Sequence, residues 1–269
     1  MRLEGAVVAI TGASRGIGRA VAKAAAAKGA KVGLMARSAA DLEAVLGAIG
    51  GTGATAVADV ADRPSVESAL EKLAAALGPI DVLVNNAGIG KYASVLDTDV
   101  EDFERLMRVN YFGAVYATKA VLPGMAARRR GHIVNVSSIV GRIGTPFEAA
   151  YSASKFALTG LSEAMAVEVE PFNIGVSMVS PGPVATDFFD TRGVPYARSF
   201  PKPVSPEKVA NAVIAAVERN RREQLIPAWF RQAIIFKTLV PPLFFRGTSR
   251  SLSKELEDLV AGTERDAPN

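Results

Sequence analysis

Short apolar runs alternate along the chain with longer, Ala-rich segments of helical periodicity. This alternation restricts the fold most strongly, because parallel strands need a crossover segment, usually a helix, between them. Several of the short runs lack the polar alternation of a half-exposed strand, which indicates strands buried on both faces. Seven strands are predicted, at residues 6–10, 31–36, 54–58, 81–85, 132–137, 174–180 and 223–226.

The longer segments between these strands have the composition and the periodicity of helices. They include residues 19–28, 65–77, 100–125 and 149–169. Strands that alternate with helices form a parallel sheet with helices on both faces. We therefore expect an α/β fold, a single Rossmann-like doubly wound domain over residues 1–269 with a seven-stranded parallel sheet.

Composition excludes several classes of protein. The chain has no Cys, which excludes disulfides, thiolate metal sites and Cys nucleophiles, and its carboxylates show no metal-ligand clustering. The formal charge of +4 comes from scattered basic residues, so no nucleic-acid partner is expected. The run 128–130, three arginines, is interpreted as a solvated helix C-terminus. Disorder is expected only at residues 263–269, and the absence of a secretory signal pattern makes a cytoplasmic location the expectation.

A Gly-rich turn follows the first predicted strand and leads into a helix. Its glycines permit a tight turn and close packing of the helix, and they bring a helix N-terminus against the pyrophosphate of a dinucleotide. The alternative is a structural turn without a ligand. The predicted cofactor contacts in this turn are Gly12, Ser14, Arg15, Gly16, Ile17 and Gly18.

The residue that follows the second predicted strand indicates which dinucleotide is preferred. An acidic residue there would accept hydrogen bonds from the ribose 2′-hydroxyl of NAD, but the chain has Ala36 followed by Arg37. A guanidinium pairs with a 2′-phosphate, and Arg15 adds a second positive charge. The alternative is that each arginine is a solvated surface side chain. Together they predict NADP(H) as the cofactor.

Tyr151 and Lys155 are four residues apart within a predicted helix and therefore share one face of it. An ammonium beside a phenol stabilises the phenolate and lowers the phenol pKa from its usual value of about 10. The pair therefore predicts an acid/base group that works near neutral pH, and with a nicotinamide cofactor it indicates hydride transfer.

These motifs occur in an order that resembles the short-chain dehydrogenase/reductase family over roughly residues 4 to 230. The Gly-rich turn resembles that family's TGxxxGxG motif, and Tyr151 with Lys155 resembles its YxxxK pair. Asn110 and Ser138 resemble the family's remaining catalytic residues. Further cofactor contacts that the resemblance implies are Asp59, Val60, Asn86, Ala87, Gly88, Pro181, Gly182, Val184 and Thr186.

The resemblance also implies roles for the catalytic residues. Ser138 holds the substrate oxygen, Tyr151 transfers the proton, and Lys155 orients the nicotinamide ribose, while the amide of Asn110 holds a water that connects Lys155 to solvent. Ser137 is the rival for the serine role, and family spacing selects Ser138. Two other polar residues are given structural roles: His132 is expected at the surface or as a cap, and Asp187 as a cap of the following helix.

The substrate is expected to contact a region at residues 187–203 and two segments near 89–92 and 139–147. These segments are mostly apolar, which favours an apolar carbonyl or secondary alcohol over a sugar phosphate. The alternative is that half of these side chains belong to the core. The apolar residues are Ile89, Tyr92, Ile139, Val140, Ile143, Phe147, Phe188, Phe189, Val194, Tyr196 and Phe200.

Residues 228–269 form a C-terminal extension beyond a minimal member of the family. Ile226, Phe230, Ile234, Phe236 and Val240 approximate one helical stripe that ends at two prolines, 241–242. Seven basic residues and only one acidic residue lie between positions 219 and 250, which suits a peripheral membrane contact. A helix packed on a second subunit, in a homodimer or homotetramer, is the equal alternative.

Taken together, the residues predict an NADP(H)-dependent oxidoreductase that acts on a carbonyl or secondary alcohol. Two alternatives belong to other classes: a non-catalytic NADP-binding sensor, and a lyase or epimerase of the same family. The complete set of Asn110, Ser138, Tyr151 and Lys155 disfavours the sensor. The epimerase-like relatives usually carry a longer C-terminal substrate domain, for which too few residues remain here.

Overall fold

The computed structural model describes residues 1–196 and 199–265, with side chains up to residue 261. The chain divides into two compact units, Met1–Pro227 and a second unit from Ala228 onward. The first unit holds the sheet and every predicted site residue. Residues 263–265, expected to be disordered, instead continue the last helix, and residues 266–269 of that predicted tail lie outside the described residues.

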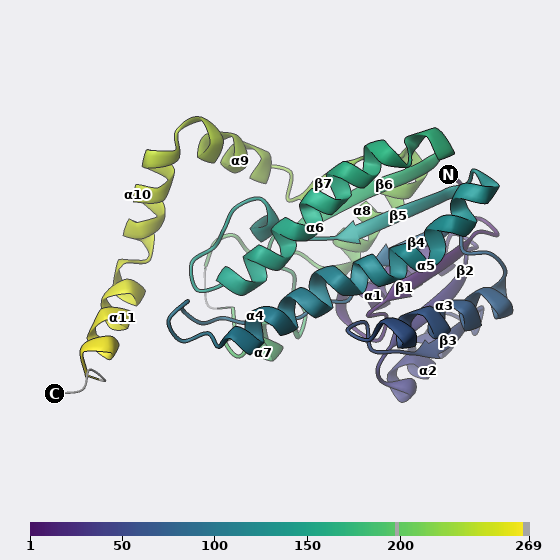
Figure 1. Cartoon of the computed structure of the whole chain (residues 1–269), viewed down its shortest axis with the longest axis horizontal. Coiled ribbons are helices and arrows are strands. Elements are labelled where there is room, and N and C mark those ends of the chain that lie inside the picture. Colours follow the sequence, from purple (N-terminus) through teal and green to yellow (C-terminus); the bar gives the residue numbers. More distant parts are fainter. Residues whose placement is uncertain (197–198, 266–269) are drawn as a thin grey trace. The chain divides into compact units, whose positions relative to one another are not determined.

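The first unit is built on a seven-stranded parallel sheet with the order β3-β2-β1-β4-β5-β6-β7 (Figure 1). The predicted strands are confirmed to within one residue at each end. The strands are β1 Val7–Thr11, β2 Lys31–Ala36, β3 Gly53–Val57, β4 Val82–Asn85, β5 Gly131–Val136, β6 Ile174–Pro181 and β7 Glu223–Ile226.

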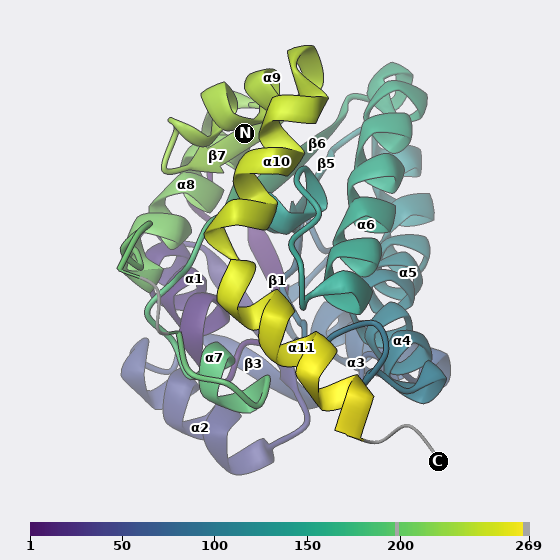
Figure 2. The same ribbon diagram turned by 90° about the vertical axis from the view of Figure 1, so that its left-hand side faces the viewer.

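Helices cover both faces of the sheet, as a doubly wound fold requires. One face packs against α1 (Gly16–Ala26), α2 (Ala39–Ala48) and α8 (Pro206–Arg219), and Figure 2 shows these three helices together on one side. The other face packs against α3 (Arg63–Leu77), α5 (Gly113–Arg128) and α6 (Ala149–Glu168). Each strand contributes side chains to the apolar layers on both faces of the sheet, because successive side chains point to opposite faces.

In β1, Val8 and Ile10 face the α1 layer, whereas Val7 and Ala9 face the α3 layer. All four side chains are buried, which explains the absence of polar alternation in the sequence of this strand. The neighbours of β1 are β2 and β4, so the strand order reverses between β1 and β4. Ligands of open α/β sheets bind at such a point, beyond the carboxyl ends of the strands.

The predicted helix at 100–125 is interrupted. It consists of α4 (Val100–Met107), a π-helical turn η1 (Arg108–Phe112) and α5. Within the wider turn the side chain of Asn110 bonds the backbone of Ile89, and just after it Gly113 lies so close to Val60 that a Cβ would be 3.0 Å away. Single π-turns inside α-helices occur frequently at functional sites.

His132 contradicts its predicted surface role. It lies at the start of β5, at the edge opposite the carboxyl ends of the strands, but it is only 2% exposed. Its Nε2 contacts the Ser177 hydroxyl at 2.8 Å. Burial lowers the pKa of His132 to about 4, so the ring is neutral at neutral pH. His132 pairs with Gly175 of β6, where a Cβ would overlap the imidazole, so the ring packs directly on the neighbouring strand.

The run 128–130 ends α5, as predicted, and its side chains bond to the protein. Arg128 and Arg129 donate to the carbonyls of Ile80 and Pro171, and Arg130 pairs with Asp81 at 3.0 Å. Within the described ranges, no three carboxylates or imidazoles are grouped as metal ligands.

The second unit consists of α9 (Phe230–Leu239), α10 (Pro241–Ser251) and α11 (Ser253–Arg265). The helix of the predicted stripe does end before the two prolines, which begin α10. The inclusion of Ile226 in that stripe is wrong, because it pairs with Pro181 in the sheet and is buried. None of the described helices is long and apolar enough to cross a membrane.

Candidate active site

The Gly-rich turn is fastened to the segment that follows β4. The hydroxyl of Thr11 accepts hydrogen bonds from the backbone N–H groups of Asn86 and Ala87 at 2.9 and 3.0 Å. The amide of Asn86 donates to the carbonyls of Thr11 and Gly12 at 3.0 and 3.1 Å. A Cβ on Gly12 would lie 2.8 Å from the Cα of Ala87. Asn86 and Ala87 therefore hold the turn at the point where the strand order reverses.

The first turn of α1 fits the pyrophosphate of a dinucleotide. Arg15 is the N-cap of this helix and has extended backbone, its side chain makes no capping hydrogen bond, and the first turn holds no acidic residue. The N–H groups at a helix N-terminus attract an anion. Gly16 has φ +53°, and a Cβ there would lie 3.3 Å from Thr186, so the glycine keeps this approach open. Ser14 and Ile17 are half-buried in the same turn, and Gly18 packs on Gly12 without room for a Cβ.

Arg15 and Arg37 are both exposed, and neither forms an ion pair with a carboxylate in the part of the chain that the structure describes. They follow adjacent strands, Arg15 as the cap of α1 beyond β1 and Arg37 directly after β2, and Ala13 N–H donates to the carbonyl of Met35 at 3.1 Å. Asp59 is exposed just beyond β3, where its carboxylate accepts from the N–H of Ala61 at 2.9 Å.

The first turns of α6 bring the acid/base candidates together beyond β5. Tyr151 and Lys155 are 8% and 3% exposed, and the Lys155 ammonium lies 5.8 Å from the centre of the Tyr151 ring. The ammonium donates to the carbonyl of Val136 at 2.9 Å. Ser138 lies immediately beyond β5, and its hydroxyl donates to the carbonyl of Pro181 at 3.3 Å and contacts Tyr151.

The acid/base pKa values differ from the sequence expectation. Burial raises the pKa of Tyr151 above its usual value, and the negative charge of Glu148 raises it further. The Ser138 hydrogen bond and the positive charge of Arg192 act in the opposite direction. Burial lowers the pKa of Lys155 to about 8. The phenol is covered by neighbouring side chains, so desolvation outweighs the stabilisation of phenolate that the i, i+4 spacing predicts.

Asn110 is buried in η1, close to the other candidates, and the rest of the protein uses most of the hydrogen-bonding capacity of its amide. Its oxygen accepts from the N–H of Ile89 at 2.8 Å, and its NH₂ donates to the Ile89 carbonyl and the Ser154 hydroxyl, both at 2.9 Å. Both amide hydrogens are therefore used within the protein. A Cβ on Gly88 would meet the Asn110 oxygen at 3.3 Å and the Lys155 ammonium at 3.6 Å.

Of the two serines beyond β5, only Ser138 faces Tyr151. The hydroxyl of Ser137 donates instead to the carbonyl of Lys155 at 3.4 Å, on the other side of the backbone. This arrangement agrees with the expectation that adjacent residues in extended backbone point to opposite sides.

The segment after β6 reaches back to the Gly-rich turn. Gly182 N–H donates to the carbonyl of Ile226 at 2.7 Å, and Val184 forms a bridge with Val204. Thr186 lies beside Gly16. The predicted capping role of Asp187 is wrong: its carboxylate makes no capping bond to α7 (Phe188–Thr191), and the Phe188 N–H donates to the Thr186 hydroxyl at 3.4 Å.

Apolar side chains surround Tyr151. Its ring lies 5.4 Å from that of Phe188, and both belong to a cluster with Ile89, Ile139 and Val140. Farther out, stacked or tilted rings pair Tyr92 with Phe147 and Phe189 with Tyr196. Other predicted pocket residues are not brought to Tyr151: Val194 and Phe200 are exposed, at 39% and 68%, and Ile143 is half-buried outside this cluster. Residues 197–198 of the substrate-loop region lie outside the described residues.

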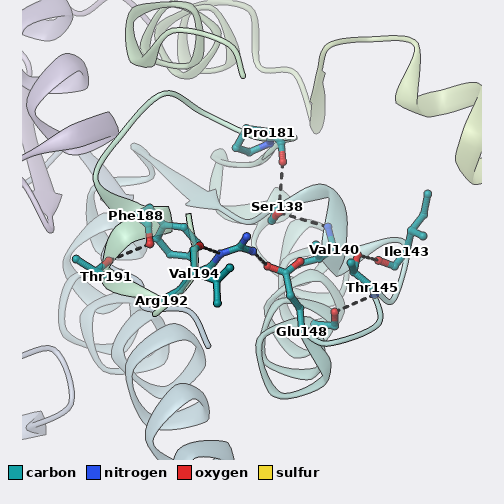
Figure 3. A network of polar contacts seen from close by, with 11 residues as sticks. Ser138, Val140, Ile143, Thr145, Glu148, Pro181, Phe188, Thr191, Arg192 and Val194 are labelled. Atoms are coloured by element: carbon teal, nitrogen blue, oxygen red, sulfur yellow. Dashed lines mark hydrogen bonds and ion pairs between the residues drawn. The ribbon is translucent and has the colours of Figure 1, made fainter. Parts of the chain in front are cut away.

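Two residues of the site are absent from the sequence prediction. Glu148 and Arg192 form a buried ion pair (Figure 3). The charges of both residues act on Tyr151. From the sequence, Glu148 is expected to interact favourably with the dipole of the helix that it precedes, and Arg192 is expected to be a solvated loop residue. The sequence carries no usable signal for this pair, because residues 187–203 include four charged residues besides Arg192.

Fold, Gly-rich turn and Tyr–Lys pair together define one class of protein, the short-chain dehydrogenases/reductases. A family model described as short chain dehydrogenase matches residues 6–194, and the chain belongs to this family of oxidoreductases. It is similar to mouse (Mus musculus) dehydrogenase/reductase SDR family member 7B, with 37% identity over 268 residues, covering 94% of this chain and 83% of the relative.

It is also similar to the 3-oxoacyl-[acyl-carrier-protein] reductase FabG of Escherichia coli (strain K12), with 39% identity over 187 residues, covering 70% of this chain and 77% of that protein. Among solved structures, a short-chain dehydrogenase/reductase from Burkholderia phymatum in complex with NAD has the same fold. The TM-score is 0.82 with 24% identity, over 90% of this chain and 96% of that one.

An alcohol dehydrogenase from Thermococcus sibiricus complexed with 5-hydroxy-NADP superposes with a TM-score of 0.74 and 28% identity, over 82% of this chain and 95% of that one.

Proposed function

We propose that the protein is an NADP(H)-dependent oxidoreductase that transfers a hydride between the nicotinamide and an apolar carbonyl compound or secondary alcohol, with Tyr151 as the acid/base. The observation that carries this proposal is the convergence of Ser138, Tyr151 and Lys155 beyond β5, at the same edge of the sheet as the Gly-rich turn. These residues supply an oxygen-holding hydroxyl, a proton carrier and a cation.

The residues act on the substrate oxygen as follows. The Ser138 hydroxyl donates a hydrogen bond to that oxygen, and in alcohol oxidation the Tyr151 phenolate accepts its proton as the hydride leaves the carbon. When bound, the dinucleotide accepts or donates the hydride, and the positive charge of its oxidised ring lowers the pKa of the nearby phenol. Lys155 adds positive charge on the same face of α6.

The preference for NADP(H) over NAD(H) rests on Arg15 and Arg37. Both guanidinium groups are exposed and lie at adjacent strand ends, and neither forms an ion pair with a carboxylate among the described side chains. Charge-assisted hydrogen bonds to a phosphate contribute about 1.5 to 3 kcal/mol each, and exposure places these at the low end.

Titration of both cofactors tests this preference. NADPH is expected to bind the wild type about tenfold or more tightly than NADH, which corresponds to about 1.4 kcal/mol. Arg37→Ala is expected to reduce that ratio, whereas Arg19→Ala, an exposed position on α1, serves as the control and keeps it. Equal dissociation constants for the two cofactors, or an unchanged ratio in Arg37→Ala, contradict the proposal.

The apolar cluster around Tyr151 supports an apolar substrate. Phe188 and Val140 pack against the phenol, and Phe189 and Tyr92 add two more rings to the same face of the site. Burial of an apolar substrate body in such surroundings contributes about 25 cal/mol per Å². NADPH oxidation with a panel of carbonyl compounds tests this: apolar ketones are expected to react, and reaction only with sugar phosphates contradicts it.

For the C-terminal extension we propose a peripheral contact with an anionic membrane surface by a cytoplasmic protein. Helices α9 and α10 carry exposed apolar side chains, among them Phe236, Leu239 and Leu243, together with Lys237 and Arg246. Apolar and cationic groups in one segment suit an interfacial helix. The alternative is that the same side chains pack on a second copy in a homodimer or homotetramer.

A further inference from the structure

A buried ion pair connects the substrate-loop region to the start of α6. Glu148 immediately precedes this helix, and its carboxylate binds the guanidinium of Arg192, which immediately follows α7 (Figure 3). The two side chains are only 11% and 7% exposed. Because the desolvation of such a pair offsets its attraction, it contributes little net stability over an apolar pair, and stability alone does not account for it.

Arg192 also contacts a third segment, the loop after β4. Its guanidinium lies 4.7 Å from the ring centres of both Tyr92 and Phe189, and its Nε donates to the Val194 carbonyl at 3.1 Å. Its own carbonyl accepts from the Tyr92 N–H at 3.3 Å. A Cβ on Gly90 would lie 3.2 Å from the Arg192 Cβ, so the loop after β4 and the loop after α7 are in direct contact.

The pair is next to the reacting group. Glu148 precedes Tyr151 by three residues, and Phe188, one helical turn before Arg192, packs on the Tyr151 ring at 5.4 Å. The negative charge of Glu148 and the positive charge of Arg192 shift the Tyr151 pKa in opposite directions. The other groups that face Tyr151 are the Lys155 ammonium on α6 and the Ser138 hydroxyl beyond β5.

We propose that the Glu148–Arg192 pair is a positioning device for the reaction: it holds the substrate loop closed over Tyr151 and balances the charge beside the phenol. Glu148 alone would keep the proton on Tyr151, and Arg192 alone would favour its release. With both present, Lys155 and the bound cofactor control proton transfer. The charge balance rests on the proposed function, in which Tyr151 carries the proton. The closure of the loop does not.

The pH profile of alcohol oxidation tests the charge balance. The midpoint of kcat/KM is expected to move upward in Arg192→Met and downward in Glu148→Gln, each by about 0.5 unit or more. The midpoint of the double variant, Glu148→Gln with Arg192→Met, is expected to return toward the wild-type value. Its KM is expected to exceed that of the wild type, because the substrate loop is no longer held. Glu168→Gln, the same change at the exposed far end of α6, is the control. Midpoints that move in the same direction, or do not move, overturn the charge balance.

Hydrogen exchange of residues 188–196 tests loop closure without any turnover. Arg192→Lys keeps the charge but loses the planar fork and the ring contacts. This variant is expected to keep the wild-type midpoint of the kcat/KM pH profile. Its backbone amides in residues 188–196 are expected to exchange faster, while its far-UV circular dichroism spectrum stays unchanged. Wild-type exchange rates in Arg192→Lys, Arg192→Met and Glu148→Gln would overturn the positioning role. If the wild type neither oxidises an alcohol nor reduces a carbonyl compound, the proposed function fails, and the exchange rates still decide whether the pair closes the loop.

Discussion

Replacement of Gly12 by Ala tests how the Gly-rich turn is held, and Gly50→Ala is its matched control. Both glycines have positive φ, +64° and +75°, so an Ala at either position costs about 1 to 2 kcal/mol of backbone strain. The two sites differ in their surroundings. A Cβ on Gly12 would lie 2.8 Å from the Cα of Ala87, whereas a Cβ on Gly50 would have nothing within 4 Å.

The overlap at Gly12 is with backbone, which cannot turn aside as a flexible side chain can. Relief therefore requires the turn and the segment after β4 to separate, which strains the hydrogen bonds from Asn86 to Thr11 and Gly12. Such overpacking costs about 1 to 3 kcal/mol. Added to the backbone strain, the expected loss is about 2 to 5 kcal/mol for Gly12→Ala, against about 1 to 2 kcal/mol for Gly50→Ala.

Urea unfolding of the two variants measures these losses, and titration with NADPH measures the effect on the site. Gly12→Ala is expected to weaken cofactor binding because the turn moves, whereas Gly50→Ala leaves binding unchanged. Equal losses of stability in the two variants would refute the reasoning, since they would show that the contact between the turn and Ala87 carries no energy.

Three further changes have defined outcomes. Tyr151→Phe keeps the ring contacts but removes the transferable proton, so turnover is expected to fall about 10²- to 10⁴-fold with little change in NADP(H) affinity. Lys155→Met is expected to lower both turnover and NADP(H) affinity. Near-normal turnover of Tyr151→Phe contradicts the acid/base role. Because the folded-state pKa of His132 is lowered to about 4, the unfolded chain binds more protons between pH 6.5 and 4. The free energy of unfolding of the wild type therefore falls as pH drops through this window, by up to about 1.4 kcal/mol per pH unit. His132→Asn is expected to lose this part of the pH dependence. If the free energies of unfolding of the wild type and His132→Asn differ by the same amount at every pH, His132 is not the cause. A chain ending at Pro227 is expected to lose co-sedimentation with anionic liposomes at low salt and to keep the oligomeric state of the full-length protein, as measured by light scattering. Full-length protein that does not bind such liposomes excludes the membrane contact.

The sequence by itself determined those features that depend on local periodicity and spacing. The strands are visible because buried strands of β-branched residues differ from Ala-rich helices over a few residues, and the sheet follows from their alternation. The Gly-rich turn is a local conformational requirement. Tyr151 and Lys155 share a face because residues i and i+4 of any helix do.

The tertiary structure alone decided what depends on segments far apart in the chain. The partner of Glu148 is 44 residues away, and the amide of Asn110 in the π-turn bonds the backbone of Ile89, 21 residues away. The burial of Tyr151, which raises its pKa, is caused by Phe188 and other side chains from distant loops. The burial and charge that surround a group set its acidity, and these follow from which loops pack together rather than from the spacing of residues along one helix.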